Sequence, residues 1–132
     1  MDADVLVRLF TGDDPDKQRS AMDLLQRANR GEVSLAIAAI TVAEVIWVMT
    51  SPRLYAIPRM EARTALLGLL QQSEIQIENR STVFRALELY GTILKDFGDA
   101  MVVATMERER ANALFAFDRG YDRIPSIERR EP

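Results

Sequence analysis

Short apolar runs alternate with longer segments of helical periodicity along the whole chain, and this alternation constrains the fold most. The short runs, at 33–38, 74–77 and 113–117, predict buried strands. The longer segments predict helices at 14–30, 41–49, 58–70, 81–94 and 96–110. Asp14-Pro15 is a typical N-cap followed by a first-turn proline, and Ser81 is expected to cap the fourth helix. Strands separated by helices predict an α/β fold with a small parallel sheet.

The length and composition narrow the chemistry that the chain can perform. The 132 residues suit one domain spanning 1–132, with a net charge of −3. The absence of cysteine and histidine excludes disulfides, thiol nucleophiles, Ser-His-Asp triads and the usual zinc sites. Catalysis must therefore use carboxylates, hydroxyls, other polar groups or a metal ion bound through oxygen. No long apolar run or signal peptide is visible, so we expect a cytoplasmic protein without a membrane.

Carboxylates recur just past the apolar runs, and each has a simple structural explanation. Thr41 and Glu44 have the spacing of a capping box. Asp96 and Asp99 fit a helix cap and a first-turn acid, and Asp118 fits a turn residue. These explanations remain open beside the functional one.

The recurrence of acids at equivalent places in the fold favours a shared site. Apolar residues flank Glu44 and Asp99, so we expect partial burial of these carboxylates. Acids that converge at about 4 Å repel one another by ~4 kcal/mol per pair at an effective dielectric near 20. Such a cluster needs bound protons, arginine partners or a cation. An all-oxygen site suits Mg²⁺ or Mn²⁺, whose most fitting chemistry here is phosphodiester hydrolysis.

The acidic motifs, taken in order, resemble those of PIN-domain nucleases, and most closely the VapC-type toxins of bacterial toxin–antitoxin pairs. The motifs are Asp2-Ala3-Asp4-Val5-Leu6-Val7-Arg8, Thr41-Val42-Ala43-Glu44, Asp96-Phe97-Gly98-Asp99-Ala100 and Phe115-Ala116-Phe117-Asp118. The similarity covers essentially the whole chain. It implies a three-layer α/β/α sandwich around a parallel sheet, with the acids at the carboxyl edge of the strands.

The resemblance also implies roles for individual residues. By position, the catalytic and metal-binding acids are Asp2, Glu44, Asp99 and Asp118, with Asp4 and Asp96 in supporting positions behind them. One or two Mg²⁺ or Mn²⁺ ions would activate water to cut single-stranded RNA, leaving 3′-hydroxyl and 5′-phosphate ends. The implied partners are RNA, a cognate antitoxin protein and a second copy in a homodimer.

The sequence departs from the family pattern at three places, and the first two, Asp4 and Ala116, support an alternative function. Asp4 and Ala116 stand where the family usually has Asn and a hydroxyl residue, and only Met1 precedes Asp2 where a central strand is usual. Asp4 adds charge that either tightens metal binding or needs a proton. The alternative function is a catalytically weak PIN-like module that binds RNA or a protein partner. A phosphatase for small phosphate esters is a third option, disfavoured by the lack of a phosphate-cradling glycine-rich motif.

Two surfaces have candidate binding roles. Arg8 and Arg119 lie beside site acids in sequence and are candidates for RNA contact, and Arg53, Arg59 and Arg63 could form a rim. A second set of apolar residues could accept an antitoxin helix, or could form the core or a homodimer face: Leu54, Tyr55, Ile57, Met60, Leu66, Leu67 and Leu70.

Overall fold

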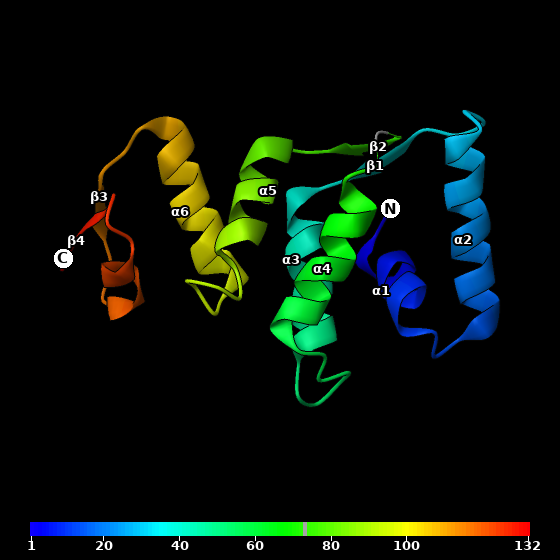
Figure 1. The fold of residues 1–132 in the computed structure, drawn as a ribbon, viewed down its shortest axis with the longest axis horizontal. Coiled ribbons are helices and arrows are strands. Elements are labelled where there is room, and N and C mark those ends of the chain that lie inside the picture. Colours follow the sequence, from blue (N-terminus) through cyan, green and yellow to red (C-terminus); the bar gives the residue numbers. More distant parts are fainter. Residues whose placement is uncertain (73) are drawn as a thin grey trace. The chain divides into compact units, whose positions relative to one another are not determined.

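The computed structural model describes residues 1–72 and 74–132, which form two compact units, Met1–Arg80 and Ser81–Pro132 (Figure 1). Each unit contains a two-stranded parallel sheet of its own. The described residues contain six α-helices in all. The predicted α/β class with small parallel sheets is therefore confirmed, and it is consistent with the expected PIN-like α/β/α fold. That residues 1–132 act as a single domain stays a prediction.

The first unit is built from four helices and two strands. Their order is α1 (Ala3–Thr11), α2 (Pro15–Asn29), β1 (Leu35–Ile37), α3 (Ala39–Thr50), α4 (Arg59–Leu70) and β2 (Ile75–Ile77). Strands β1 and β2 run parallel, with Leu35 opposite Ile75. Helix α1 packs against α2 and α3, and α3 packs against α4 (Figure 1). The side chains of Leu6, Val42 and Leu66 are completely buried in this core.

The predicted helix starts in this unit are partly right. The Asp14 carboxylate accepts a hydrogen bond from the Lys17 amide, and Pro15 opens α2, as expected. The capping box of Thr41 and Glu44 is wrong, because α3 begins at Ala39 and Thr41 already lies inside the helix. Glu78 caps this end instead, since its Oε2 accepts a 3.0 Å hydrogen bond from the Ala39 amide.

The apolar residues considered for antitoxin binding divide between core and surface. Leu66 and Leu70 are completely buried within the first unit. Leu54 and Met60 are exposed, by 54% and 43% respectively. The two leucines therefore belong to the core, and only the exposed part of the set can contact another molecule.

The second unit contains two helices, two strands and a short 3₁₀ helix. These are α5 (Arg80–Leu89), which begins at the last residue of the first unit, α6 (Phe97–Glu109), β3 (Ala113–Phe115), η1 (Arg119–Arg123) and β4 (Glu128–Arg130). Strands β3 and β4 run parallel, with Leu114 opposite Arg129. The strand predicted to reach Phe117 ends at Phe115, and the two residues that follow lead to Asp118.

Helix α5 differs from its prediction at both ends. It begins at Arg80, so Ser81 lies within the helix rather than at its cap. It ends at Leu89 instead of Leu94, because Gly91 adopts a left-handed conformation with φ of 78°. This early end lets the chain turn back toward α6, whose predicted start at Asp96 is confirmed.

Contacts between α5 and α6 stabilise the second unit. The rings of Tyr90 and Phe97 meet edge to face, with their centroids 5.9 Å apart. Arg85 on α5 holds both carboxylate oxygens of Glu107 on α6, at 2.7 and 3.0 Å. This fork-like pairing links α5 to α6, the helix whose first turn carries part of the acidic region described below.

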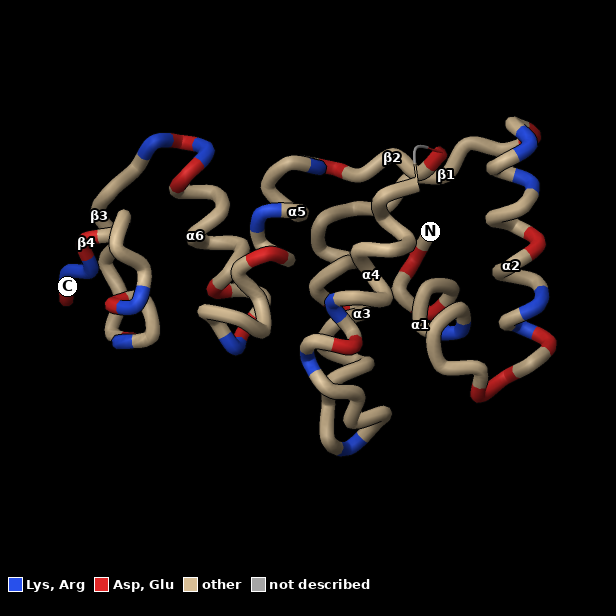
Figure 2. The backbone as a smooth tube through the Cα atoms, in the orientation of Figure 1, with Lys and Arg blue, Asp and Glu red and all other residues tan. Residues whose placement is uncertain are grey.

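Helix α2 carries charges of both signs along its length. Figure 2 shows acidic and basic residues alternating along α2. Within residues 1–72 and 74–132, no helix combines the length and apolar character needed to cross a bilayer.

Candidate functional site

Three of the predicted acids line one pocket in the second unit. The pocket has a volume of about 400 Å³, and its walls include the carboxylates Asp96, Asp99 and Asp118. Its cationic lining residues are Lys95, Arg119 and Arg123. We call this cavity the acidic pocket. It places two of the four predicted metal ligands, Asp99 and Asp118, in one cavity with the supporting acid Asp96.

Asp96 and Asp99 enter the pocket from the first turn of α6. The Oδ1 atom of Asp96 accepts a 3.0 Å hydrogen bond from the Asp99 amide, which confirms that Asp96 caps the helix. The carboxylate lies so close to the backbone that a Cβ at Gly98 would be 2.9 Å from Asp96 Oδ1. The sequence Asp-Phe-Gly-Asp therefore uses glycine to make room for the capping carboxylate.

Asp118 is held by the same kind of turn at the start of η1. Its Oδ1 accepts a 2.7 Å hydrogen bond from the Gly120 amide, and a Cβ at Gly120 would be 3.1 Å from this oxygen. The predicted turn role of Asp118 is thus confirmed. In both turns the structural role uses one carboxylate oxygen, so it does not exclude a second role for the other oxygen.

Asp99 is fixed by a tyrosine that lies 22 residues later in the chain. The hydroxyl of Tyr121, on η1, donates a 2.8 Å hydrogen bond to Asp99 Oδ1. The Tyr121 side chain is only 6% exposed. Burial, followed by this hydrogen bond and by the charges of Asp99, Asp118 and Asp96, raises the pKa of the Tyr121 hydroxyl well above its usual range. The hydroxyl is therefore a neutral donor to Asp99 at neutral pH.

The other oxygens of the three pocket carboxylates are available to a ligand. The Oδ2 atoms of Asp96, Asp99 and Asp118 accept no hydrogen bond within the described residues. No described lysine or arginine forms an ion pair with any of the three, although Arg119 and Arg123 line the same pocket. The pocket thus holds carboxylates that no cation in the described chain neutralises through a direct contact.

The other two predicted ligands lie in the first unit. Asp2 caps α1, since its Oδ1 accepts a 3.1 Å hydrogen bond from the Val5 amide. The adjacent amino group of Met1 donates a 2.6 Å hydrogen bond to the Ala36 carbonyl, which places Asp2 near β1. Glu44 lies on α3 after β1.

Partial burial was expected for Glu44 and Asp99, and this expectation is confirmed for Asp99 and wrong for Glu44. Asp99 is partly buried, whereas Asp2, Glu44 and Asp118 are exposed. The apolar neighbours of Glu44, such as Val45 and Ile46, face the core of the first unit, while Glu44 itself lies on the other side of the helix. Apolar flanking sequence therefore did not predict the environment of the acid.

Arg8 belongs to a different group of side chains that pair with one another, which we call the turn cluster: Arg8, Thr11, Asp13 and Tyr55. Asp13 accepts hydrogen bonds from the Tyr55 hydroxyl at 2.6 Å, from Arg8 at 2.6 Å and from Thr11 at 2.9 Å. These bonds, that of Tyr55 first, hold the pKa of the Asp13 carboxyl well below its usual range. Arg8 also forms a 3.1 Å ion pair with Asp4. The guanidinium of Arg8 is thus shared between Asp4 and Asp13.

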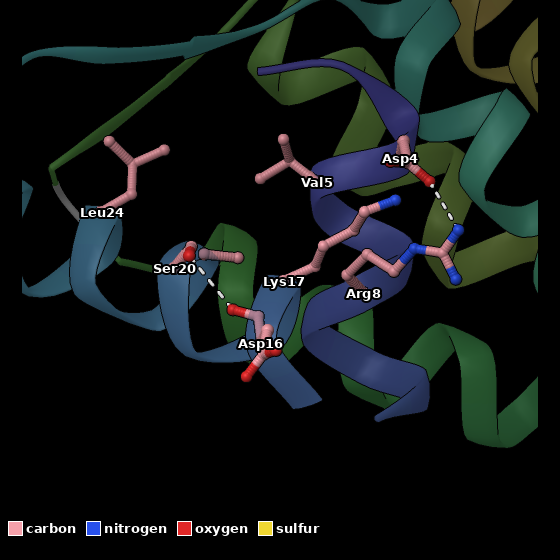
Figure 3. A pocket seen from close by; sticks show the side chains of 8 residues that line it. Asp4, Val5, Arg8, Asp16, Lys17, Ser20 and Leu24 are labelled. Carbon is pink, nitrogen blue, oxygen red and sulfur yellow. Dashed lines mark hydrogen bonds and ion pairs between the residues drawn. The ribbon is translucent and has the colours of Figure 1, made fainter. Parts of the chain in front are cut away.

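A second cavity, of about 380 Å³, lies beside this group between α1 and α2. Figure 3 shows Asp4 and Arg8 on one wall, with the Lys17 side chain extending from α2 toward Asp4. Acidic and basic residues both line this cavity, and Asp16 and Lys17 lie on its α2 side. Acids and bases are equal in number in both cavities, but here Asp4 and Arg8 pair with each other at 3.1 Å, whereas the three acids of the acidic pocket form no ion pair among the described residues.

The described residues contain no complete metal-binding group. Within residues 1–72 and 74–132, no three acidic side chains are close enough together to hold one ion. The donor chemistry of the acidic pocket nevertheless fits a hard divalent cation, because each carboxylate keeps an oxygen that no described donor contacts.

Sequence reasoning missed several residues that shape these sites. Tyr121 was overlooked, although a tyrosine three residues after Asp118 needs a partner for its hydroxyl if the ring is buried. Gly98 and Gly120 were also overlooked as spacers, and the Asp-x-Gly pattern that they share could have revealed them. Glu78 could not have been identified as the cap of α3 without knowing that β2 lies beside β1.

Comparison with known families agrees with the α/β fold. The family model described as the PIN domain matches residues 1–127. No curated protein matches the chain. The family match covers almost the whole chain, so the chain belongs to the PIN-domain family. PIN domains are generally nucleases that use divalent metal ions, and the chain therefore has a nuclease-type fold.

Proposed function

We propose that this PIN-domain protein is a Mg²⁺- or Mn²⁺-dependent endoribonuclease and the toxin of a toxin–antitoxin pair. The acidic pocket of the second unit is the observation that carries the nuclease part of the proposal. Asp96, Asp99 and Asp118 line it, and no described cation pairs with them. Each of these carboxylates keeps an oxygen that a divalent cation could bind.

The proposed ligands are the four acids identified from the sequence. Asp99 and Asp118 would offer their Oδ2 atoms, and Asp2 and Glu44 complete the proposed set. When bound, the divalent ion supplies an activated water and stabilises the charge that develops on the phosphate during hydrolysis. Asp96 holds the first turn of α6, and so places Asp99, through the hydrogen bond to the Asp99 amide.

Arginines at the acidic pocket would bind the RNA backbone. Arg119 and Arg123 line the pocket and make no ion pair with any described carboxylate, so their guanidinium groups are available for phosphate. The guanidinium of Arg8, the other candidate from the sequence, is engaged by Asp4 and Asp13. Of the two predicted contacts, Arg119 is therefore the stronger candidate.

A direct test compares RNA cleavage by the parent, Asp2→Asn and Asp99→Asn with Mg²⁺, with Mn²⁺ and with a chelator. We expect metal-dependent cleavage by the parent and its loss in both variants. The proposal fails if the parent is inactive with both metals, or if all three proteins cleave equally.

The protein partners follow from the family resemblance. We propose a cognate antitoxin and a homodimer, and the exposed Leu54 and Met60 offer apolar surface for such contacts. A short neighbouring reading frame that encodes a DNA-binding fold with a disordered tail would support the antitoxin. Light scattering of the isolated chain tests the homodimer, and a strict monomer at high concentration would contradict it.

A catalytically weak binding module remains the second candidate. It is favoured by the absence, among the described residues, of three acids close enough to hold one ion. Ala116 also lacks the hydroxyl that is usual in the family at this position. Titration with Mn²⁺ separates the two functions, because binding of metal or RNA without cleavage supports the module.

A further inference from the structure

The hydroxyl of Tyr121 joins two segments that each carry an acid of the acidic pocket. Tyr121 lies on η1, which begins directly after Asp118. Its hydroxyl donates a 2.8 Å hydrogen bond to Oδ1 of Asp99, in the first turn of α6. The bond therefore connects the turn that holds Asp118 to the carboxylate of Asp99.

The geometry of this bond restricts how Asp99 can present its oxygens. An aspartate in the first turn of a helix can rotate freely about its terminal torsion unless a donor fixes it. The Tyr121 ring is nearly fully buried, so its hydroxyl has little freedom to move. With Oδ1 held by Tyr121, the oxygen left without a donor among the described residues is Oδ2.

A phenylalanine ring would fill the same buried space without the hydroxyl. The core of the second unit already contains such rings, including Phe97. The tyrosine hydroxyl therefore has a polar role, and Asp99 is its hydrogen-bond partner in the described structure.

We propose that Tyr121 is a positioning residue that fixes the rotation of Asp99 and its distance from Asp118, so that the two carboxylates can bind one divalent ion. The inference rests on the proposed function, since the ion is part of that function. Partners that orient a metal ligand typically affect metal affinity or activity by about 10–100-fold. We expect an effect in the lower part of this range, because Asp99 keeps its place on α6.

The test compares Tyr121→Phe with Tyr55→Phe as a matched control. Both changes remove a hydroxyl that donates to an aspartate, and Tyr55 belongs to the turn cluster rather than to the acidic pocket. Mn²⁺ affinity is measured by calorimetry and by electron paramagnetic resonance, and folding by thermal melts. We expect Tyr121→Phe to weaken Mn²⁺ binding about 10-fold. Tyr55→Phe should bind Mn²⁺ as the parent does.

RNA cleavage kinetics provide a second readout. We expect Tyr121→Phe to lower kcat about as much as it lowers Mn²⁺ occupancy, with less than about a twofold change in KM for RNA, because no RNA contact is removed. In an Asp99→Asn background, Tyr121→Phe should cause little further loss of Mn²⁺ affinity, since the two residues act through the same carboxylate.

The outcomes separate this inference from the proposed function. A folded Tyr121→Phe protein with the Mn²⁺ affinity of the parent overturns the positioning role, whatever its Tm. A parent that binds Mn²⁺ but does not cleave RNA overturns the nuclease function, while weaker Mn²⁺ binding by Tyr121→Phe would still support the positioning role. A parent that binds no Mn²⁺ overturns both.

Discussion

In the first unit, Asp13 accepts hydrogen bonds from Arg8, Thr11 and Tyr55, and Arg8 is also paired with Asp4. In the second unit, Asp96, Asp99 and Asp118 line one pocket and form no ion pair with the described chain. Both regions combine aspartates, arginines and a tyrosine. They differ in whether the carboxylate charge is neutralised by the protein itself.

This difference separates a structural role from a functional one. The turn cluster has donors for its carboxylate and anions for its arginine, so it joins the α1–α2 turn to Tyr55 without an external ligand. The acidic pocket leaves one oxygen on each carboxylate without a donor, and leaves Arg119 and Arg123 without an anion. Groups that remain unpaired in a cavity are candidates for binding and catalysis.

The largest expected effect compares one aspartate from each region. Asp99→Asn should lower RNA cleavage by more than about 100-fold. This is a larger decrease in activity than is typical when a residue that only orients a metal ligand is removed. It should change Tm little, because Asn can still accept the Tyr121 hydrogen bond. Asp13→Asn should lower Tm and leave cleavage unchanged, since it weakens the turn cluster only.

Cleavage rates at saturating Mg²⁺ and thermal melts of the same preparations check this pair of variants. The comparison breaks down if Asp13→Asn loses as much activity as Asp99→Asn while it remains folded.

A smaller effect is expected for the arginines on RNA affinity. Arg119→Gln and Arg123→Gln should each weaken RNA binding and reduce the slope of log K against log salt by about 0.7, the value for one phosphate contact on a single strand. Arg8→Gln should leave the slope unchanged, because Arg8 is already paired with Asp4 and Asp13.

Fluorescence anisotropy over a series of salt concentrations, in the Asp99→Asn background to prevent cleavage, measures the three slopes. An unchanged slope for Arg119→Gln and Arg123→Gln, or a reduced slope for Arg8→Gln, would show that the RNA follows a different surface.

A still smaller effect concerns stability alone. Tyr55→Phe removes the hydroxyl that donates to Asp13, and we expect Tm to fall by a few degrees. Calorimetric melts at neutral pH measure the change. A Tm equal to that of the parent would mean that Arg8 and Thr11 alone are sufficient to hold the turn cluster.

The smallest expected effect is a pH dependence of the turn cluster. Its hydrogen bonds hold the pKa of Asp13 below its usual value, so this stabilisation is present above the unfolded pKa of 3.8 and is lost as the pH falls through the lower folded pKa. The Tm of the parent should therefore decrease more than that of Asp13→Asn as the pH falls from about 4 toward about 2. Equal decreases in both proteins would place the acid sensitivity elsewhere.

Much of the local structure could be predicted because its signals are short in range. Asp14-Pro15 and Asp96 each sit next to the backbone amides that they cap, so their helix starts could be recognised directly. The strands predicted at 33–38 and 74–77 could be located because short apolar runs are also a local signal. Each observed strand is shorter than the predicted one. The capping box of Thr41 and Glu44 failed because its spacing also occurs inside a helix whose start is set elsewhere.

The sequence by itself determined the α/β class, the absence of histidine and thiol chemistry, and the order of the acids. These follow from residue types and periodicity, which need no knowledge of distant contacts. Only the tertiary structure decided which carboxylates are neutralised by the protein. Arg8 meets Asp13 and Tyr55, and Tyr121 meets Asp99, through contacts between segments that the sequence separates by up to 47 residues. The energy of a charge depends on such neighbours in space, and its sequence position does not reveal them.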